Sequence, residues 1–181
     1  MIDLAFRSIF HLFLAGLFLT ASSASGKTPV NSGYFDPYQI ENTIKLNAGD
    51  ILIDSTKRKL YFAYDDEIVI VYPVAVGREG AGWKGSATIE RMVDGPTWYP
   101  TADQKRKKKL PDSVPPGPRN PLGDYALYLY QGGKDTLIRI HGTNNPSSVG
   151  KAVSDGCFRM RNEHVSELFG YVYEGAKVTV K

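Results

Sequence analysis

The chain has 181 residues, a length that suits one domain with a substantial hydrophobic core, and no internal repeat divides it. Its formal charge of +3 at pH 7 fits an anionic substrate or surface but is too small to identify one. The single cysteine excludes a disulfide within the chain. One cysteine and three histidines at no recognisable ligand spacing also argue against a zinc site, and we expect no metal or other cofactor.

Residues 1–25 have the pattern of a secretory signal peptide. Arg7 precedes an apolar stretch from Ile9 to Leu19, and the small residues at 21–25 supply a cleavage site. The apolar stretch is shorter than the ~20 residues that a membrane-spanning helix needs. We therefore expect export to the periplasm or cell envelope, with no stable membrane span after cleavage.

The rest of the chain divides into a short leader and one domain. Residues 26–48 are polar and interrupted by Pro and Gly, so we expect a leader with little structure of its own, followed by a domain over residues 49–181. Stretches rich in β-branched and aromatic residues predict strands at 51–54, 59–64, 67–76, 86–93, 125–130, 136–140 and 177–180.

One short helix is predicted near the C-terminus, with Asn162 as its N-cap and Gly170 at its end. Many strands and one helix predict a mainly β fold, a β-sandwich or an open barrel.

Residues 94–123 contain seven prolines and no periodicity, so we expect a long loop that forms a lid or a binding wall. Its basic run, Lys105 to Lys109, is interpreted as a solvated loop tip, with contact to an anionic polymer as the alternative. Nucleic acid is not an expected partner, because the chain looks exported and has no recognised binding motif.

Cys157 is the candidate nucleophile, because an unpaired thiol in an exported chain is a liability unless its chemistry is used. A thiol needs a neighbouring base to become a thiolate near neutral pH. His141 lies 16 residues earlier, at the predicted end of an apolar strand. His164 lies in the first turn of the predicted helix and is expected to face solvent. His141 is therefore the better candidate for the general base.

The neighbours of Cys157 also suit catalysis. Gly156 allows a substrate or another backbone to approach closely, and the Cys157 amide would contribute to an oxyanion hole. Arg159 would grip a carboxylate or stabilise the turn. Taken singly, each residue has a non-catalytic interpretation: Cys157 as a small buried side chain and His141 as a structural histidine. Their occurrence together, with Ser154 also close in sequence, favours a catalytic site.

These residues resemble the YkuD-type L,D-transpeptidases of bacterial cell walls. The strongest match combines His141-Gly142-Thr143 with Ser154-x-Gly156-Cys157-x-Arg159, and weaker matches at 55–61, 72–77, 96–100, 115–118 and 120–126 follow in the family's order. The resemblance covers residues 50–181. It implies a β-rich fold and acyl transfer in which Cys157 is the nucleophile, His141 the base and the Gly142 carbonyl the group that orients the imidazole. It further implies that the oxyanion and substrate pockets are shaped by Thr143, Ser154, Gly156 and Arg159.

Two positions depart from the family's pattern. Asp155 stands where members often have His, and an acidic neighbour tends to raise a thiol's pKa. Residues 82–87 retain only Gly85 of a frequent Thr-Pro-Thr-Gly pattern, which changes the local wall of the site.

The resemblance implies a reaction on peptidoglycan stem peptides. Cys157 would attack the third residue of a tetrapeptide stem and release D-Ala, and an amine would then take up the acyl group. That amine would belong to another stem, giving a 3→3 cross-link, or to an envelope protein. Two alternatives stay open: a hydrolase (an L,D-carboxypeptidase) that uses water instead of the amine, and a catalytically silent wall-binding protein, which only Asp155 favours.

Overall fold

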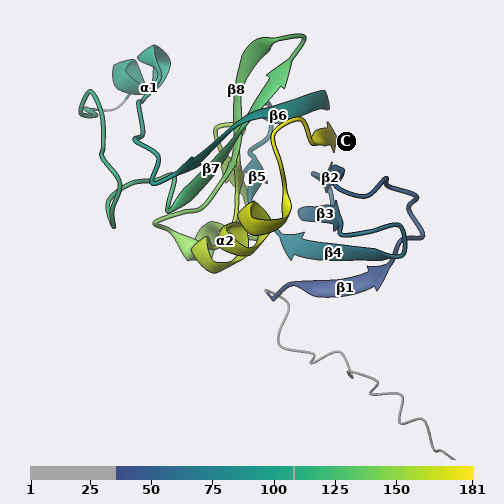
Figure 1. Ribbon diagram of the computed structural model, residues 1–181. Coiled ribbons are helices and arrows are strands. Elements are labelled where there is room, and N and C mark those ends of the chain that lie inside the picture. Colours follow the sequence, from purple (N-terminus) through teal and green to yellow (C-terminus); the bar gives the residue numbers. More distant parts are fainter. Residues whose placement is uncertain (1–35, 108) are drawn as a thin grey trace, which may run out of the picture.

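The computed structural model describes residues 36–107 and 109–181, so the predicted signal peptide lies outside the described residues. Nine strands form one open sheet in the order β1-β4-β3-β2-β11-β6-β7-β8-β10 (Figure 1). Its strands are β1 (Tyr38–Glu41), β2 (Ile51–Asp54), β3 (Lys59–Ala63), β4 (Ile68–Pro73), β6 (Gly85–Asp94), β7 (Tyr125–Gln131), β8 (Lys134–His141), β10 (Phe158–Arg159) and β11 (Lys177–Val180). A second, two-stranded sheet pairs β5 (Val76–Gly77) with β9 (Ala152–Ser154).

The first half of the sheet is built on the predicted hairpin of β3 and β4. At its turn the Asp65 carboxylate accepts hydrogen bonds from the amides of Glu67 and Ile68, at 2.8 and 2.7 Å. The strand predicted over 67–76 ends at Pro73, because proline has no N–H to continue a ladder. Val76 then pairs with β9 in the second sheet.

β11 joins the two halves of the sheet. It pairs in parallel with β2 and antiparallel with β6. The second half continues through the antiparallel strands β6, β7 and β8, and it closes on β10, which runs parallel to β8 and sets Arg159 opposite His141. The β7–β8 register shifts between Tyr128 and Tyr130, which marks a bulge in β8.

The hydrophobic core lies between the two halves and is closed by α2 (Asn162–Tyr171) (Figure 1). Side chains from β2, β3, β4, β6, β7, β8 and β11 join Val165 and Leu168 of α2 in one cluster. Burial of each such side chain contributes about 1.5–3 kcal/mol to folding. The prediction of a mainly β fold is confirmed, with this helix following Cys157 as expected.

Details of α2 differ from the prediction. Its N-cap is Arg161 rather than Asn162, and it continues through Gly170 to Tyr171. The aromatic packing of Tyr171 explains the extra residue. Its ring stacks on Phe62 with centroids 6.0 Å apart, and Tyr64 meets it edge-on at 5.4 Å.

Besides the short strands β9 and β10, a strand and a helix were not predicted. β1 lies within the leader, where little structure was expected, and pairs with β4 along the edge of the sheet. α1 (Ala102–Lys107) lies within the Pro-rich segment and takes up part of the basic run. The basic side chains are exposed, as expected, but they belong to a helix whose Asp103 forms ion pairs with Arg106 and Lys107. Across the described ranges, no helix combines the length and apolarity needed to cross a membrane.

Candidate active site

Cys157 and His141 border the same pocket, at the end of β8 and the start of β10. His141 is the last residue of β8, and Cys157 immediately precedes β10. Arg159 borders the pocket as well, and its backbone pairs with Ala75 on the other side through two hydrogen bonds of 3.0 and 2.8 Å. The pairing of β10 with β8 therefore brings together two side chains that the sequence separates by 16 residues.

The surroundings of His141 fix its protonation. The side chain is buried, with 4% exposure, and its Nδ1 lies 2.6 Å from the carbonyl oxygen of Gly142. A carbonyl only accepts hydrogen bonds, so Nδ1 carries the proton and Nε2 keeps its lone pair. Burial lowers the pKa of His141 to about 4, although the Gly142 carbonyl opposes that shift. At neutral pH the imidazole is therefore uncharged and able to accept a proton at Nε2.

Close packing behind His141 holds the Gly142 carbonyl in place. Asn162, the first residue of α2, accepts a hydrogen bond of 2.9 Å from the Thr143 amide through its Oδ1. A Cβ at Gly142 would collide with this Oδ1. Gly123 has a left-handed backbone (φ +65°), and a Cβ there would collide with Asn162 and the Thr143 amide. Glycine is required at both positions.

A tight turn presents the thiol of Cys157. The Ser154 hydroxyl donates to the Cys157 carbonyl at 2.6 Å and accepts from the Gly156 amide at 3.1 Å. Gly156 has a φ of +130°, which only glycine adopts readily. Ser154 thus shapes the turn through its hydroxyl, and Gly156 through its backbone conformation.

The thiol is half-buried, and burial raises its pKa. The Arg139 backbone N–H and the charges of Arg139 and Arg159 act in the opposite direction and lower the pKa of Cys157. The Asp155 carboxylate raises it, but this is the weakest of these influences. Asp155 forms an ion pair with Arg78, so its charge is largely compensated. The departure from the family's pattern at 155 therefore weighs less on the thiol than the sequence suggested.

The Pro-rich segment forms a wall of the site, as the sequence predicted. Trp98, Gln104 and Leu122 border both the pocket and a longer groove that also reaches Cys157. Hydrogen bonds hold this wall in place. Trp98 and Val114 exchange backbone hydrogen bonds of 2.9 Å, and Gln104 of α1 donates to Asp155 at 3.2 Å.

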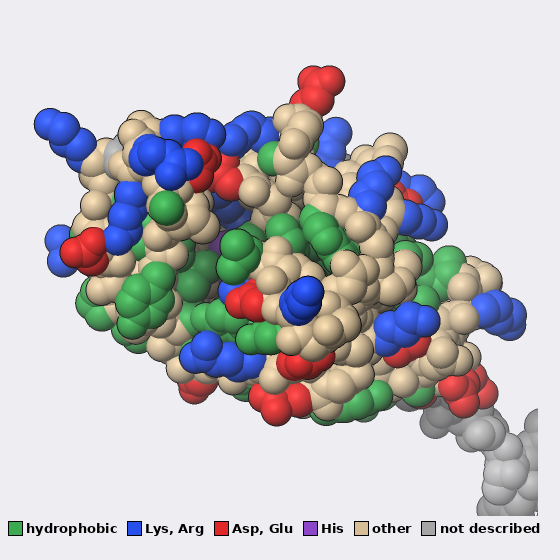
Figure 2. Space-filling view, turned by 90° about the horizontal axis from the view of Figure 1, so that it is seen from above, with side chains coloured by type: hydrophobic (Ala, Val, Ile, Leu, Met, Phe, Trp, Pro, Cys, Tyr) green, Lys and Arg blue, Asp and Glu red, His purple; other side chains and the backbone are tan. Residues whose placement is uncertain are grey.

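Charged side chains of both signs lie along this groove, with one more basic than acidic. Its border includes Arg78, Lys107 and Arg139, beside Asp103 and Asp155, which form ion pairs with Lys107 and Arg78. Lys and Arg side chains gather over the α1 end of the molecule (Figure 2). This distribution fits a substrate that carries carboxylates.

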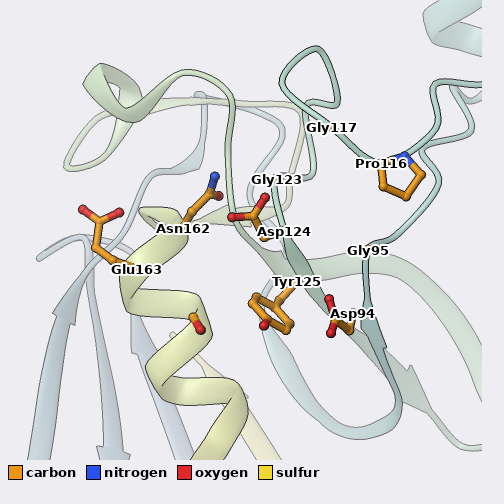
Figure 3. A pocket seen from close by; sticks show the side chains of 10 residues that line it. Asp94, Gly95, Pro116, Gly117, Gly123, Asp124, Tyr125, Asn162 and Glu163 are labelled. Carbon is orange, nitrogen blue, oxygen red and sulfur yellow. The ribbon is translucent and has the colours of Figure 1, made fainter.

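A separate hollow, away from the pocket of Cys157, is lined by Gly123 and Asn162 (Figure 3). Three carboxylates line it, from Asp94, Asp124 and Glu163, and neither Cys157 nor His141 borders it. Over residues 36–107 and 109–181, no group of three His, Cys, Asp or Glu side chains is placed to hold a metal ion. Because neither Cys157 nor His141 lines this hollow, it is not part of the candidate site.

Two residues differ from what the sequence suggested. His164, expected to face solvent, is buried with 5% exposure, because the face of α2 that carries it packs against the core and near the ring of Tyr72. Asn162, predicted from the sequence as the N-cap of the helix, instead accepts a hydrogen bond from the Thr143 amide, a contact that the sequence did not predict. Thr143 is buried, and its hydroxyl accepts from the Asn145 amide at 3.0 Å, so the hydroxyl bonds within its own loop while the amide reaches Asn162.

Comparison with known proteins agrees with this geometry. The family model for the L,D-transpeptidase catalytic domain (YkuD) matches residues 48–180. A Salmonella typhimurium protein named probable L,D-transpeptidase ErfK/SrfK is 35% identical over 153 residues, which are 80% of this chain and 47% of that protein. The chain thus spans about half the length of this curated relative.

Solved structures share the fold. A Brucella melitensis structure, named a probable carnitine operon oxidoreductase, is 38% identical, with a TM-score of 0.56 over 79% of this chain and 91% of that one. A Cys-to-Ser mutant of an Enterococcus faecium L,D-transpeptidase is 18% identical, with a TM-score of 0.57 over 75% of this chain and 50% of that one. Since the matched residues 48–180 make up most of the chain and include both Cys157 and His141, the chain belongs to the L,D-transpeptidase catalytic domain family.

Proposed function

We propose that this protein is a cysteine-dependent L,D-transpeptidase that acts on peptidoglycan stem peptides in the cell envelope. The observation that carries the proposal is the shared pocket of Cys157 and a buried, uncharged His141 whose Nδ1 is held by the Gly142 carbonyl. A thiol beside a neutral imidazole is the arrangement that activates a sulfur nucleophile.

In the first half of the proposed reaction, Nε2 of His141 takes the thiol proton. The thiolate attacks the carbonyl carbon of the third stem residue, and a tetrahedral oxyanion forms. The Cys157 amide N–H is the proposed donor to that oxyanion, because the Gly156 amide already donates to Ser154. The C–N bond to the terminal D-Ala then breaks, His141 returns the proton to the leaving amine, and a thioester remains on Cys157.

In the second half, an amine attacks the thioester and restores the thiol. The amine of another stem gives a 3→3 cross-link, and the amine of an envelope protein gives an anchored protein. The groove bordered by Arg78, Lys107 and Arg139 supports binding of the carboxylates of a stem peptide. We propose that Arg159, which borders the pocket beside His141, contacts such a carboxylate too.

Mass spectrometry of the protein with a disaccharide-tetrapeptide, beside its Cys157→Ala variant, tests the proposal. Release of D-Ala with a Cys157-dependent dimer is the expected result. A Cys157-dependent tripeptide without dimer indicates hydrolysis in this assay, and added amines of stem or protein origin then separate a carboxypeptidase from a missing acceptor. An unchanged substrate, with a thiol no more reactive than a free cysteine, indicates the silent wall-binding alternative.

Two further variants assign the roles. Cys157→Ser and His141→Ala should each abolish D-Ala release while the folded state persists, as judged by circular dichroism. An active Cys157→Ser variant would overturn the mechanism.

A further inference from the structure

We propose that the bulge of β8, residues Asp135–Arg139, positions the Cys157 thiol, and that Leu137 is its central positioning residue. The inference rests on the proposed role of Cys157 as nucleophile and adds a part that neither the motif around Cys157 nor the one around His141 contains.

The backbone of Leu137 is the first observation. Its φ is +60°, in the left-handed region that residues with a side chain seldom adopt. Leu137 is also 64% exposed, so core packing does not impose the conformation. Strained residues of this kind gather at functional sites, where the surrounding structure holds them.

Local hydrogen bonds build the bulge. The Leu137 amide donates to the Asp135 carboxylate at 2.8 Å, and the Ile138 amide donates to the Thr136 hydroxyl at 3.1 Å. That hydroxyl in turn donates to the Leu129 carbonyl of β7 at 2.6 Å. Thr136 thus anchors the bulge to the neighbouring strand.

Arg139 clamps the same segment. Its guanidinium binds both oxygens of Asp135, each at 2.7 Å, and stacks on the ring of Tyr128 at 4.2 Å. The Arg139 side chain is 13% exposed, so this pair is better shielded from water than an ordinary surface ion pair. The clamp restrains the bulge at both ends.

The bulge offers the sulfur of Cys157 both an acceptor and a donor. The thiol donates to the Leu137 carbonyl at 3.7 Å, and the Arg139 backbone N–H lies close enough to lower the pKa of the thiol. A regular strand alternates the direction of successive carbonyls and amides, whereas a bulge re-aims them. The two extra residues in β8 are therefore what lets one segment face the sulfur in its protonated and its ionised form.

This arrangement has a chemical consequence. In the resting protein the thiol proton is directed at the Leu137 carbonyl, so the thiol must turn this proton towards Nε2 of His141 before transfer. The thiolate that remains keeps the Arg139 N–H as its donor. A hydrogen bond to an ionised group is about twice as strong as one between neutral groups, so the Arg139 N–H opposes the rise in the thiol pKa that burial causes.

The test is the pH dependence of Cys157 alkylation by iodoacetamide, which needs no peptidoglycan substrate. Thr136→Val keeps the shape of the side chain but removes the hydroxyl that anchors the bulge. We expect the apparent pKa of the thiol to rise by about one unit, which slows alkylation at pH 7 about tenfold. Thr179→Val, on β11 and outside the pocket that Cys157 shares with His141, is the matched control and should leave the profile unchanged.

Leu137→Gly separates backbone from side chain. Glycine adopts a φ of +60° without strain, so the bulge and the pH profile should persist, whereas Leu137→Pro cannot adopt this φ and should shift the profile as Thr136→Val does. If Thr136→Val fails to fold, Asp135→Ala removes the acceptor of the Leu137 amide and replaces it in the test. A wild-type profile in folded Thr136→Val or Asp135→Ala, or an equal shift in Leu137→Gly, would overturn the proposal. D-Ala release plays no part in this measurement, so failure of the proposal about the bulge can be distinguished from failure of the proposed function.

Discussion

His141 is kept uncharged by its surroundings, and this makes the stability of the protein depend on pH. Burial lowers its pKa from 6.5 to about 4. Between these two values the unfolded chain binds a proton that the folded protein does not. The free energy of unfolding therefore falls as the pH falls from about 6.5 towards 4.

We expect the wild-type protein to lose about 2 kcal/mol more unfolding free energy between pH 7 and pH 4.5 than a His141→Gln variant does. Urea denaturation at the two pH values measures this. His164 shifts in the same direction through burial, so His164→Gln is the matched control and reports the contribution of the second histidine. Equal pH dependence in wild type and His141→Gln would show that His141 is not buried in its neutral form.

Gly142 is a second residue whose identity follows from the packing around it. A Cβ at this position would collide with Asn162 and press on the Asp124 amide at 3.2 Å. Gly142→Ala should destabilise the protein by about 1–3 kcal/mol and displace the carbonyl that holds His141. Gly170→Ala is the matched control. It lies in α2 with open space around it, so it should stabilise the protein by about 0.5–1 kcal/mol. Denaturation of both variants measures the contrast, and a neutral Gly142→Ala would contradict the packing argument.

At the scale of elements, α1 is held over the site by few contacts. It has no buried residues of its own, and the hydrogen bond from Gln104 to Asp155 links it to the turn that carries Cys157. An element with little buried surface opens easily, so the two hydrogen bonds of the Gln104 side chain, to Asp155 and from the Thr101 amide, carry much of its order.

Gln104→Ala should therefore make α1 easier to cleave with trypsin, which cuts after its basic residues. We expect cleavage within residues 105–107 to become several-fold faster, since loss of a hydrogen bond worth about 0.5–1.5 kcal/mol raises the open population about 2- to 12-fold. Gln131→Ala removes a similar exposed hydrogen bond, from the end of β7 to the Ser86 carbonyl. This control variant should be cleaved at the same rate as the wild-type protein. Equal cleavage of all three proteins would show that Asp155 does not restrain α1.

The elements that sequence reasoning found are those with a strong local pattern. The runs Ile51–Asp54 and Ile68–Pro73 are apolar and β-branched, and they form strands as expected. The short strands β9 and β10 were missed because two or three residues become a strand only when a distant segment supplies their hydrogen bonds. α1 was missed because prolines surround it and no buried face gives it a periodic pattern.

The candidate site was predictable only in part for the same reason. His141 and Cys157 occur in recognisable local motifs, and the structure brings them to one pocket. The contact of Asn162 with the Thr143 amide depends on how α2 packs, and the bulge at Leu137 occurs at a residue that normally avoids a positive φ. Neither leaves a signal in the sequence around it.

At the scale of the whole molecule, the order of the sheet separates β1 from the candidate site. β1 forms one edge of the nine strands and β10, beside Cys157, forms the other. β1 covers the edge of β4, and its Ile40 packs with Leu46 on a small cluster of Ala63, Val69 and Val71. Removing β1 should therefore affect stability and association without reaching the thiol.

A variant that begins at residue 48, compared with one that begins at residue 36, tests this separation. Loss of the partly buried Ile40 and Leu46 should lower the unfolding free energy by about 2 kcal/mol. The bared edge of β4 should then promote association, because an unpaired strand edge is a template for another chain. Urea denaturation and light scattering measure both effects. The alkylation rate of Cys157 should be the same in the two variants, because seven strands separate β1 from β10 in the sheet. A slower rate in the shorter variant would instead show that the edge strand is coupled to the site across the whole sheet.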